Sequence, residues 1–448
     1  MKRLIAPLAL LPAIAAAGQE QQQPNIVMLF VDDMGWADFG MRNPDYETPN
    51  LDRLTQEGLN FNRAYVSTAT SSPSRASIMT GKEALRCGFV RHIYGNDPDA
   101  EFESLDTDPG HMLSRAYLPL EEITYAERLK EYGYYNCFVG KWHLGNRAYF
   151  PDKQGFDEMR GTTHRGHPDN YYYPFFNKRN AENPFKDSKP GDYLTDKITD
   201  EAVDFLQTYE GKAPFLLNVW YYTVHSPQIG KKELIQKYLD KGFEGQQADY
   251  AAKIEVLDNS IGRIRETLEK EGLADNTVII FASDQGGAYK NGHLRGGKMG
   301  GETLCEGGSR IPMVIYAPGS PVMGTTCYDP IQTIDVFPTL VELASRKKCK
   351  DKQINGVSLL PLLDGKKLAD RDLFMHRSYE DQNCCIMRGD WKLIKYRSGK
   401  LELYNLKEDE SEQHNLVEAQ PKLAAKLLKA LNKWQKEATP SYLLTNQN

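Results

Sequence analysis

Four short apolar runs, separated by stretches with helical periodicity, constrain the fold of this chain more than any other feature of its sequence. The runs lack the alternation of polar and apolar residues that marks a strand with one solvent-exposed face, so each predicts a strand covered on both sides. Together with the helical stretches they predict an α/β fold, in which a large, mostly parallel mixed sheet is sandwiched by helices. The predicted strands are 25–31, 135–139, 215–222 and 277–282, and the predicted helices are 120–132, 195–209 and 250–271.

The end of the chain follows a different pattern. Three short apolar segments between residues 384 and 406 are joined by turn-forming residues, which predicts consecutive antiparallel strands. Residues 421–437 place leucines and a tryptophan at helical spacing, which predicts a helix packed against these strands. We therefore expect an N-terminal α/β domain over residues 18–365 and a small α+β subdomain, an antiparallel sheet with a helix, over residues 366–448.

The first residues have the pattern of a targeting segment. A basic start, Met1 to Arg3, precedes an apolar run that ends in three alanines, which predicts a signal peptide over residues 1–17. The run is shorter than the roughly 20 residues that span a bilayer, and no later segment is long and apolar enough. No cysteine precedes Cys87, so a lipid-modified cysteine at the cleavage site is not expected. We expect a periplasmic or secreted protein with no membrane span.

The net charge and the cysteines of the sequence argue against two kinds of ligand, nucleic acid and zinc. The net charge of -6 argues against a nucleic-acid partner, although a local basic pocket could still bind an anionic substrate. The seven cysteines include no C-x-x-C pair, so a zinc site is not indicated, and the sequence leaves any disulfide pairing open.

Polar side chains follow each of the four predicted strands. In open α/β sheets, ligands bind outside the carboxyl ends of the strands. A single aspartate after a strand is more often part of a turn or a helix cap. Four strands that each deliver carboxylates, a lysine or a histidine to one edge instead predict a single assembled site. These residues are Asp32, Asp33, Lys141, His143, His225, Asp284 and Gln285.

Besides the four strand ends, a serine-rich stretch is a candidate part of the site. It covers residues 71–82 and has the sequence SSPSRASIMTGK. Pro73 suits the first turn of a helix, which places Ser71 or Ser72 at the helix N-terminus. The free backbone N–H groups and the helix dipole favour an anion there. A serine in this position is equally explained as a simple helix cap.

This stretch resembles the signature of the type I, formylglycine-dependent sulfatases: Cys or Ser, any residue, Pro, any residue, Arg, four residues, Thr-Gly. The resemblance extends over roughly residues 24–416 and implies an alkaline phosphatase-like fold and a sulfuric ester hydrolase. All fixed positions of the signature are present: Ser71, Pro73, Arg75, Thr80 and Gly81. Other blocks that resemble the family are residues 48–54, 155–157, 306–312 and 335–339.

The resemblance implies that Ser71 is oxidised to formylglycine by a maturase before export. Hydrated formylglycine has two hydroxyls on one carbon. One hydroxyl attacks sulfur, and the other allows the aldehyde to re-form as sulfate leaves, whereas an unmodified serine would stop at a stable sulfate ester.

The resemblance also implies a metal site, formed by Asp32, Asp33, Asp284, Gln285 and the modified Ser71. All of these groups offer oxygen ligands, which suits Ca²⁺, with Mg²⁺ as the alternative. The family usually has asparagine at position 285, so the glutamine is a departure. Its amide oxygen can still coordinate, one methylene further from the backbone.

The remaining catalytic residues are implied by the same resemblance. Arg75 supports the formylglycine, and Lys141 and Lys298 hold the sulfate. His143 takes a proton from the formylglycine as sulfate is released. His225 protonates the leaving oxygen, a role that suits histidine near neutral pH.

Several basic residues are candidates for substrate contacts. The resemblance implies a sulfated carbohydrate as substrate, and basic and aromatic side chains together suit a sulfated sugar. An ordinary surface loop explains the same residues equally well. The candidates are Arg91, His92, Arg165, His167, His376 and Arg377.

Three other functions stay open. The first is a phosphodiesterase or phosphonate hydrolase of the same superfamily, against which the set of Lys141, His143, His225 and Lys298 argues. The second is a sulfated-glycan-binding protein in which Ser71 is never oxidised. The third is a purely structural exported protein, which the assembled polar edge does not favour.

Overall fold

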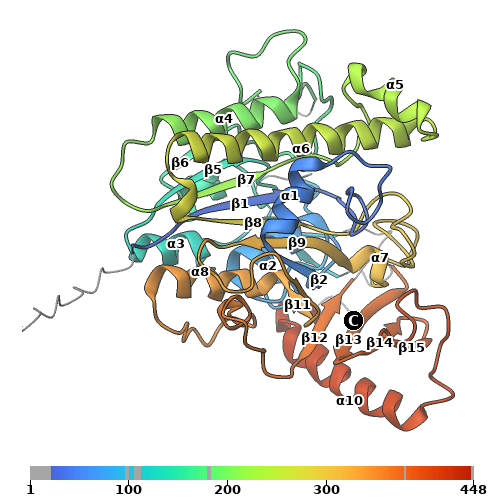
Figure 1. The fold of residues 1–448 in the computed structure, drawn as a ribbon. Helices are drawn as coiled ribbons and strands as arrows, with labels where there is room; N and C mark the ends of the chain where they lie inside the picture. Colours follow the sequence, from blue (N-terminus) through green and yellow to red (C-terminus); the bar gives the residue numbers. More distant parts are fainter. Residues whose placement is uncertain (1–21, 96–99, 105–111, 179–182, 378–379, 445–448) are drawn as a thin grey trace, which may run out of the picture.

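A nine-stranded sheet forms the centre of the molecule (Figure 1). Its strands are β1 (Asn25–Val31), β2 (Leu59–Tyr65), β5 (Tyr135–Gly140), β6 (Glu158–Arg160), β7 (Phe215–Trp220), β8 (Thr277–Ser283), β9 (Arg310–Tyr316), β10 (Thr326–Cys327) and β11 (Ile331–Gln332). The strand order is β10-β2-β9-β8-β1-β7-β5-β6, with β11 also beside β2. Only β9 runs antiparallel to its neighbours, so the prediction of a mostly parallel mixed sheet is confirmed.

The computed structural model describes residues 22–95, 100–104, 112–178, 183–377 and 380–444. The predicted signal peptide, residues 1–17, lies outside the described residues. Among the helices that are described, none is long and apolar enough to cross a lipid bilayer. The seven cysteines all lie in the described part and form no disulfide there.

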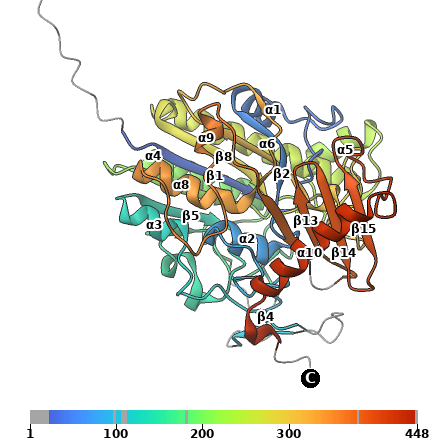
Figure 2. The same cartoon turned by 90° about the horizontal axis from the view of Figure 1, so that it is seen from below.

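Helices cover both faces of the sheet (Figures 1 and 2). Alternate side chains of β1 enter two separate cores, Ile26 on one face and Val27 on the other. This two-sided burial is why the strand is a continuous apolar run. One face carries α1 (Pro49–Glu57), α4 (Leu194–Thr208), α5 (Lys232–Asp240) and α6 (Gln246–Lys270). The other carries α2 (Ser71–Thr80), α3 (Tyr125–Glu131), α8 (Val336–Ser345) and α9 (Leu360–Leu363).

Differences from the predicted elements have local causes. The helix predicted from residue 120 begins at Tyr125, because Thr124 caps it: the Thr124 hydroxyl accepts from the backbone N–H of Glu127, and the Glu127 carboxylate accepts from that of Thr124. The strand predicted to reach residue 222 ends at Trp220, where the chain turns into the site.

A second sheet, of four antiparallel strands, lies at the C-terminal end of the chain (Figure 2). Its strands are β12 (Asp372–His376), β13 (Gln382–Arg388), β14 (Trp391–Tyr396) and β15 (Leu401–Asn405), followed by α10 (Pro421–Ala438). Leu427, Leu431 and Trp434 of α10 pack against this sheet, as the helical spacing predicted. The described fold also contains several short 3-10 helices and the short elements β3 (Phe102–Glu103), β4 (Ser114–Arg115) and α7 (Glu306–Ser309).

Candidate functional site

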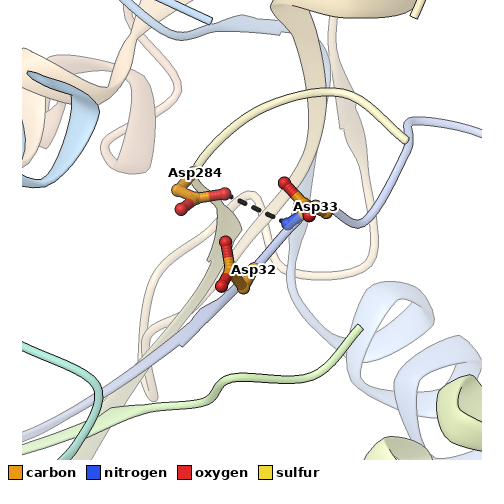
Figure 3. Close-up of side chains that lie close together, drawn as sticks. All are labelled: Asp32, Asp33 and Asp284. Atoms are coloured by element: carbon orange, nitrogen blue, oxygen red, sulfur yellow. Dashed lines mark hydrogen bonds between the residues drawn. The ribbon is translucent and has the colours of Figure 1, made fainter. Parts of the chain in front are cut away.

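Three carboxylates meet at the carboxyl edge of the central sheet (Figure 3). Asp32 and Asp33 follow β1, and Asp284 follows the neighbouring β8. Each is buried, and each offers one oxygen within 4.8 Å of those of the other two. The backbone N–H of Asp33 donates to Asp284 Oδ1 at 3.1 Å, and Asp33 has a φ of 63°, which is uncommon for a residue other than glycine. The strand ends and this turn bring the carboxylates together.

This cluster fits a hard divalent cation. Asp32 Oδ1 is buried and accepts no hydrogen bond from any described residue. Burial and the neighbouring Asp284 raise the pKa of Asp32 well above its ordinary value. Gln285 also lies at the cluster, where its Nε2 donates to Asp33 Oδ1 at 2.5 Å. An unsatisfied carboxylate oxygen among carboxylate and amide groups is the donor set that Ca²⁺ or Mg²⁺ prefers.

Ser71 is the first residue of α2 and points into the same cluster. Thr70, and not Ser71, is the N-cap residue, and no side chain caps the helix. The Ser71 hydroxyl donates to Asp284 Oδ2 at 3.0 Å and accepts from Lys141 Nζ at 2.8 Å and Arg75 Nε at 3.2 Å. Ser71 is therefore not a simple helix cap, because its hydroxyl bonds to side chains of the site and not to the backbone N–H groups of α2.

Three cations balance the three carboxylates. Arg75 pairs with Asp284 at 3.0 Å, Lys141 contacts Asp32, and Lys298 contacts Asp33. Burial lowers the pKa of Lys141, whereas the pKa of Lys298 is raised because Asp33 and Asp32 outweigh the effect of burial. The cations lie around Ser71, so the site can hold an anion at that position.

Two histidines lie beside the cluster, His143 next to Ser71 and His225 next to Asp33. His143 Nε2 lies 3.0 Å from the Ile93 carbonyl, which can only accept, so Nε2 carries the hydrogen and Nδ1 faces the Ser71 hydroxyl at 3.4 Å. His225 Nδ1 likewise lies 2.8 Å from the Ser226 carbonyl, which leaves Nε2 3.8 Å from Asp33 Oδ2. Burial, and then nearby lysines, hold the pKa of both histidines well below the ordinary value.

A pocket of about 460 Å³ lies above Ser71. It is lined by His143, His225 and Gln285, which the sequence placed at the strand ends, and by Lys298, which the family resemblance indicated. Four of the six candidates for substrate contacts also line it: His92, Arg165, His167 and Arg377. Lining residues that the sequence did not indicate include Thr70, Tyr94, Met299 and Glu380.

The other two candidates lie away from the pocket lining. Arg91 is buried, with its guanidinium 4.0 Å from the centre of the Tyr94 ring. His376 is buried at the end of β12, and burial, together with Arg397, lowers its pKa to about 3. We leave both out of the proposed substrate contacts.

Arg165 lines the pocket, but its guanidinium is turned to its own loop. It donates to Asp169 Oδ1 at 2.9 Å and to the Lys178 carbonyl at 3.0 Å. Its first role is therefore to hold the loop that carries His167.

Two buried residues contact the His225 loop in a way that the sequence did not indicate. Lys253 of α6 and Tyr171 both donate to the backbone of the loop that carries His225. A signal was present, because Lys253 lies three residues after Tyr250 and four before Leu257, on the buried side of α6. A lysine at apolar helical spacing marks a buried charge, which needs a partner.

Comparisons with known proteins agree with this geometry. The family described as Sulfatase matches residues 24–345, and the family described as N-sulphoglucosamine sulphohydrolase, C-terminal, matches residues 302–437. N-acetylgalactosamine-6-sulfatase of Mus musculus is 34% identical over 400 residues, which cover 84% of this chain and 72% of that protein.

Solved structures share the fold. The crystal structure of Ps i-CgsB in complex with k-i-k-neocarrahexaose is 28% identical, with a TM-score of 0.80 and coverage of 94% of both chains. A second structure, in complex with its substrate D-glucosamine-2-N,6-O-disulfate, is 22% identical, with a TM-score of 0.72 and coverage of 95% of this chain and 100% of that one. At this lower identity the likeness concerns the fold alone.

Proposed function

The chain belongs to the sulfatase family of sulfuric ester hydrolases, and we propose that it is an exported enzyme that removes sulfate from glycans by means of a formylglycine made from Ser71. The observation that carries this proposal is the set of contacts around the Ser71 hydroxyl. Lys141, Arg75 and Asp284 all lie within 3.2 Å of it, at the base of a pocket open to a substrate.

Two groups would complete the site. A Ca²⁺ or Mg²⁺ ion, held by Asp32, Asp33, Asp284 and Gln285, would supply positive charge to a sulfate oxygen and to the nucleophile. A formylglycine hydrate at position 71, made by a maturase before export, would supply the attacking hydroxyl and a second hydroxyl that permits turnover. The orphaned Asp32 Oδ1 and the converging contacts at Ser71 support these assignments.

The other side chains of the site bind the sulfate and transfer protons. Lys141 and Lys298 hold sulfate oxygens, and Arg75 holds the side chain at position 71 against Asp284. His143 accepts the proton of the position 71 hydroxyl at Nδ1, the ring nitrogen that faces it. His225, as an imidazolium, gives a proton from Nε2 to the oxygen that leaves sulfur, while its Nδ1–H donates to the Ser226 carbonyl. An anionic sulfate bound beside the ring would favour this protonated form.

We propose a sulfated sugar residue as the group that enters the pocket. A volume of about 460 Å³ is within the range of sites that enclose small ligands. His92, His167 and Arg377 line it with aromatic or basic side chains, and the Arg377 guanidinium is held there by Thr70 and Glu380. The mouse relative is named for N-acetylgalactosamine-6-sulfate chemistry, and Ps i-CgsB holds a neocarrahexaose, which supports a glycan substrate.

The test is release of inorganic sulfate from a panel of position-defined sulfated sugars. The protein is co-expressed with a formylglycine-generating maturase, and conversion at position 71 is verified by mass spectrometry. We expect release from at least one sugar and none from the Ser71→Ala variant. An aryl phosphate diester, assayed in parallel, separates a sulfatase from a phosphodiesterase. No sulfate release by verified, modified protein would falsify the proposal.

A further inference from the structure

The loop that carries His225 is fixed from behind by a buried lysine. Lys253 of α6 has no exposed surface, and its Nζ donates to the carbonyls of Val224 at 3.1 Å, His225 at 2.5 Å and Pro227 at 3.2 Å. It also lies 3.0 Å from Gln228 Oε1. Three backbone carbonyls of the loop therefore point to the ammonium group and bind it.

A buried tyrosine adds a second donor to the same loop. The Tyr171 hydroxyl lies 2.8 Å from the His225 carbonyl and 2.7 Å from the Tyr222 carbonyl. Its ring faces Lys253, whose Nζ is 4.0 Å from the ring centre. The Tyr171 hydroxyl has one hydrogen, which these two carbonyls share, so the His225 carbonyl accepts from Lys253 and from a bifurcated bond of Tyr171. Both contacts restrict the orientation of the His225 peptide group and with it the direction of the side chain.

A lysine in this place is not explained by stability alone. A buried ammonium group loses its hydration, and a hydrocarbon side chain of similar size would avoid that loss. The hydrogen bonds of Lys253 are directed to loop carbonyls and to a neutral amide, with no carboxylate among them. What the lysine adds is one defined conformation of the His225 loop.

We infer that Lys253 and Tyr171 are positioning residues for the proton transfer to the leaving group, because they hold the His225 carbonyl and so aim the imidazole at the reacting oxygen. This inference rests on the proposed function. When the S–O bond breaks, its electron pair passes to the oxygen, which takes the Nε2 proton of the His225 imidazolium and leaves as the alcohol. The imidazole that remains is neutral, with its hydrogen on Nδ1 toward the Ser226 carbonyl. Neither positioning residue is among those that line the pocket.

The test is a double-mutant cycle with His225. Lys253→Met and Tyr171→Phe are made in the wild-type background and in a His225→Ala background, all as formylglycine-bearing protein. We expect each to lower kcat/KM by about tenfold or more in the wild-type background and by less than about twofold when His225 is absent. The substrates are phenyl sulfate and the sulfated sugar that the wild type cleaves fastest.

The leaving group supplies a second readout. Nitrophenolate leaves without a proton, whereas phenolate and sugar alcohols need one. The loss caused by Tyr171→Phe should therefore be smaller for 4-nitrophenyl sulfate than for phenyl sulfate. Because Tyr171→Phe removes a hydroxyl and no charge, it keeps the inference testable if Lys253→Met does not fold.

Tyr193→Phe is the matched control. Tyr193 is also buried, and its hydroxyl donates to the Ile229 carbonyl at 2.8 Å, beyond the His225 loop. We expect no dependence on the His225 background. Equal losses from Tyr171→Phe in both backgrounds would mean a structural role and would overturn the inference. If His225→Ala has no effect, the acid assignment fails, and if the wild type releases no sulfate, the proposed function fails; either result removes the inference as well.

Discussion

Lys392 of β14 is a buried cation that joins the C-terminal sheet to α7, and its replacement by methionine gives a large, calculable loss of stability. Its Nζ lies 2.9 Å from Glu306 and 3.1 Å from Glu412, and all three side chains are buried. Removing one member of a buried ion cluster leaves the remaining charges unpaired, which costs about 3–5 kcal/mol. We expect Lys392→Met to lower the free energy of unfolding by that amount at pH 8.

The penalty should depend on pH through Glu412. Burial raises the pKa of Glu412 to about 7, Lys392 opposes the rise and Glu306 adds to it. A carboxyl with a raised folded-state pKa contributes stability that is present below its unfolded value of 4.5 and is lost as the pH rises through 7. That shift corresponds to roughly 3 kcal/mol. Without Lys392 the pKa of Glu412 rises further, so the penalty is larger at pH 8 than at pH 5.5.

Urea unfolding at both pH values, followed by tryptophan fluorescence, measures this penalty. Lys395→Met is the control, on the same strand. Lys395 Nζ donates to two neutral amide oxygens, Asn432 Oδ1 at 2.8 Å and Gln435 Oε1 at 3.0 Å. It should change stability by less than about 1 kcal/mol. The reasoning would be refuted if both variants lost the same free energy of unfolding, or if the loss caused by Lys392→Met were the same at both pH values.

Two further predictions concern the site. An added Cβ at Gly166 would lie 2.4 Å from His143 Nε2, so Gly166→Ala should displace that ring and lower kcat/KM by about tenfold or more at unchanged formylglycine content; unchanged kinetics would show that the ring can move without loss. Ca²⁺ at a hundredfold excess over its Kd should raise the free energy of unfolding of the wild type by about 3 kcal/mol, which is seen as a higher thermal midpoint. Asp33→Asn should abolish this shift, while Asp258→Asn, a buried aspartate that binds the start of α1, should keep it. A shift retained in Asp33→Asn would contradict the metal site.

The strands that carry the site could be predicted because burial on both faces leaves a plain signal in the sequence. β1 and β8 are apolar apart from residues at their ends, and the polar residues that follow them mark the carboxyl edge. β9 is apolar after Arg310 but contains Pro312, which argues against a central strand, and β2 carried no continuous apolar run. β2 contains Asn60, Asn62 and Arg63, and its pairing with β9 is interrupted between Phe61 and Ala64, which breaks the periodicity on which prediction depends.

The sequence predicted the metal-binding and catalytic residues of the site, but it did not indicate all the residues that line the pocket or hold the His225 loop. Lys298 lies on a long loop with no regular structure, so only the family resemblance indicated it. Glu380 and Met299 reach the pocket from segments far apart in the chain, which no local pattern reveals. Lys253 falls in a stretch for which the sequence predicts only a helix, although its spacing places it among buried side chains.

The oxidation of Ser71 is the central claim, and one measurement tests it most directly. Preparations with different degrees of conversion are made by varying co-expression of the maturase. The fraction converted, seen as the loss of two hydrogen atoms from the peptide that contains residue 71, is compared with the rate of sulfate release. We predict a rate proportional to the converted fraction and zero at no conversion. Full activity in protein whose Ser71 is unmodified would contradict the account.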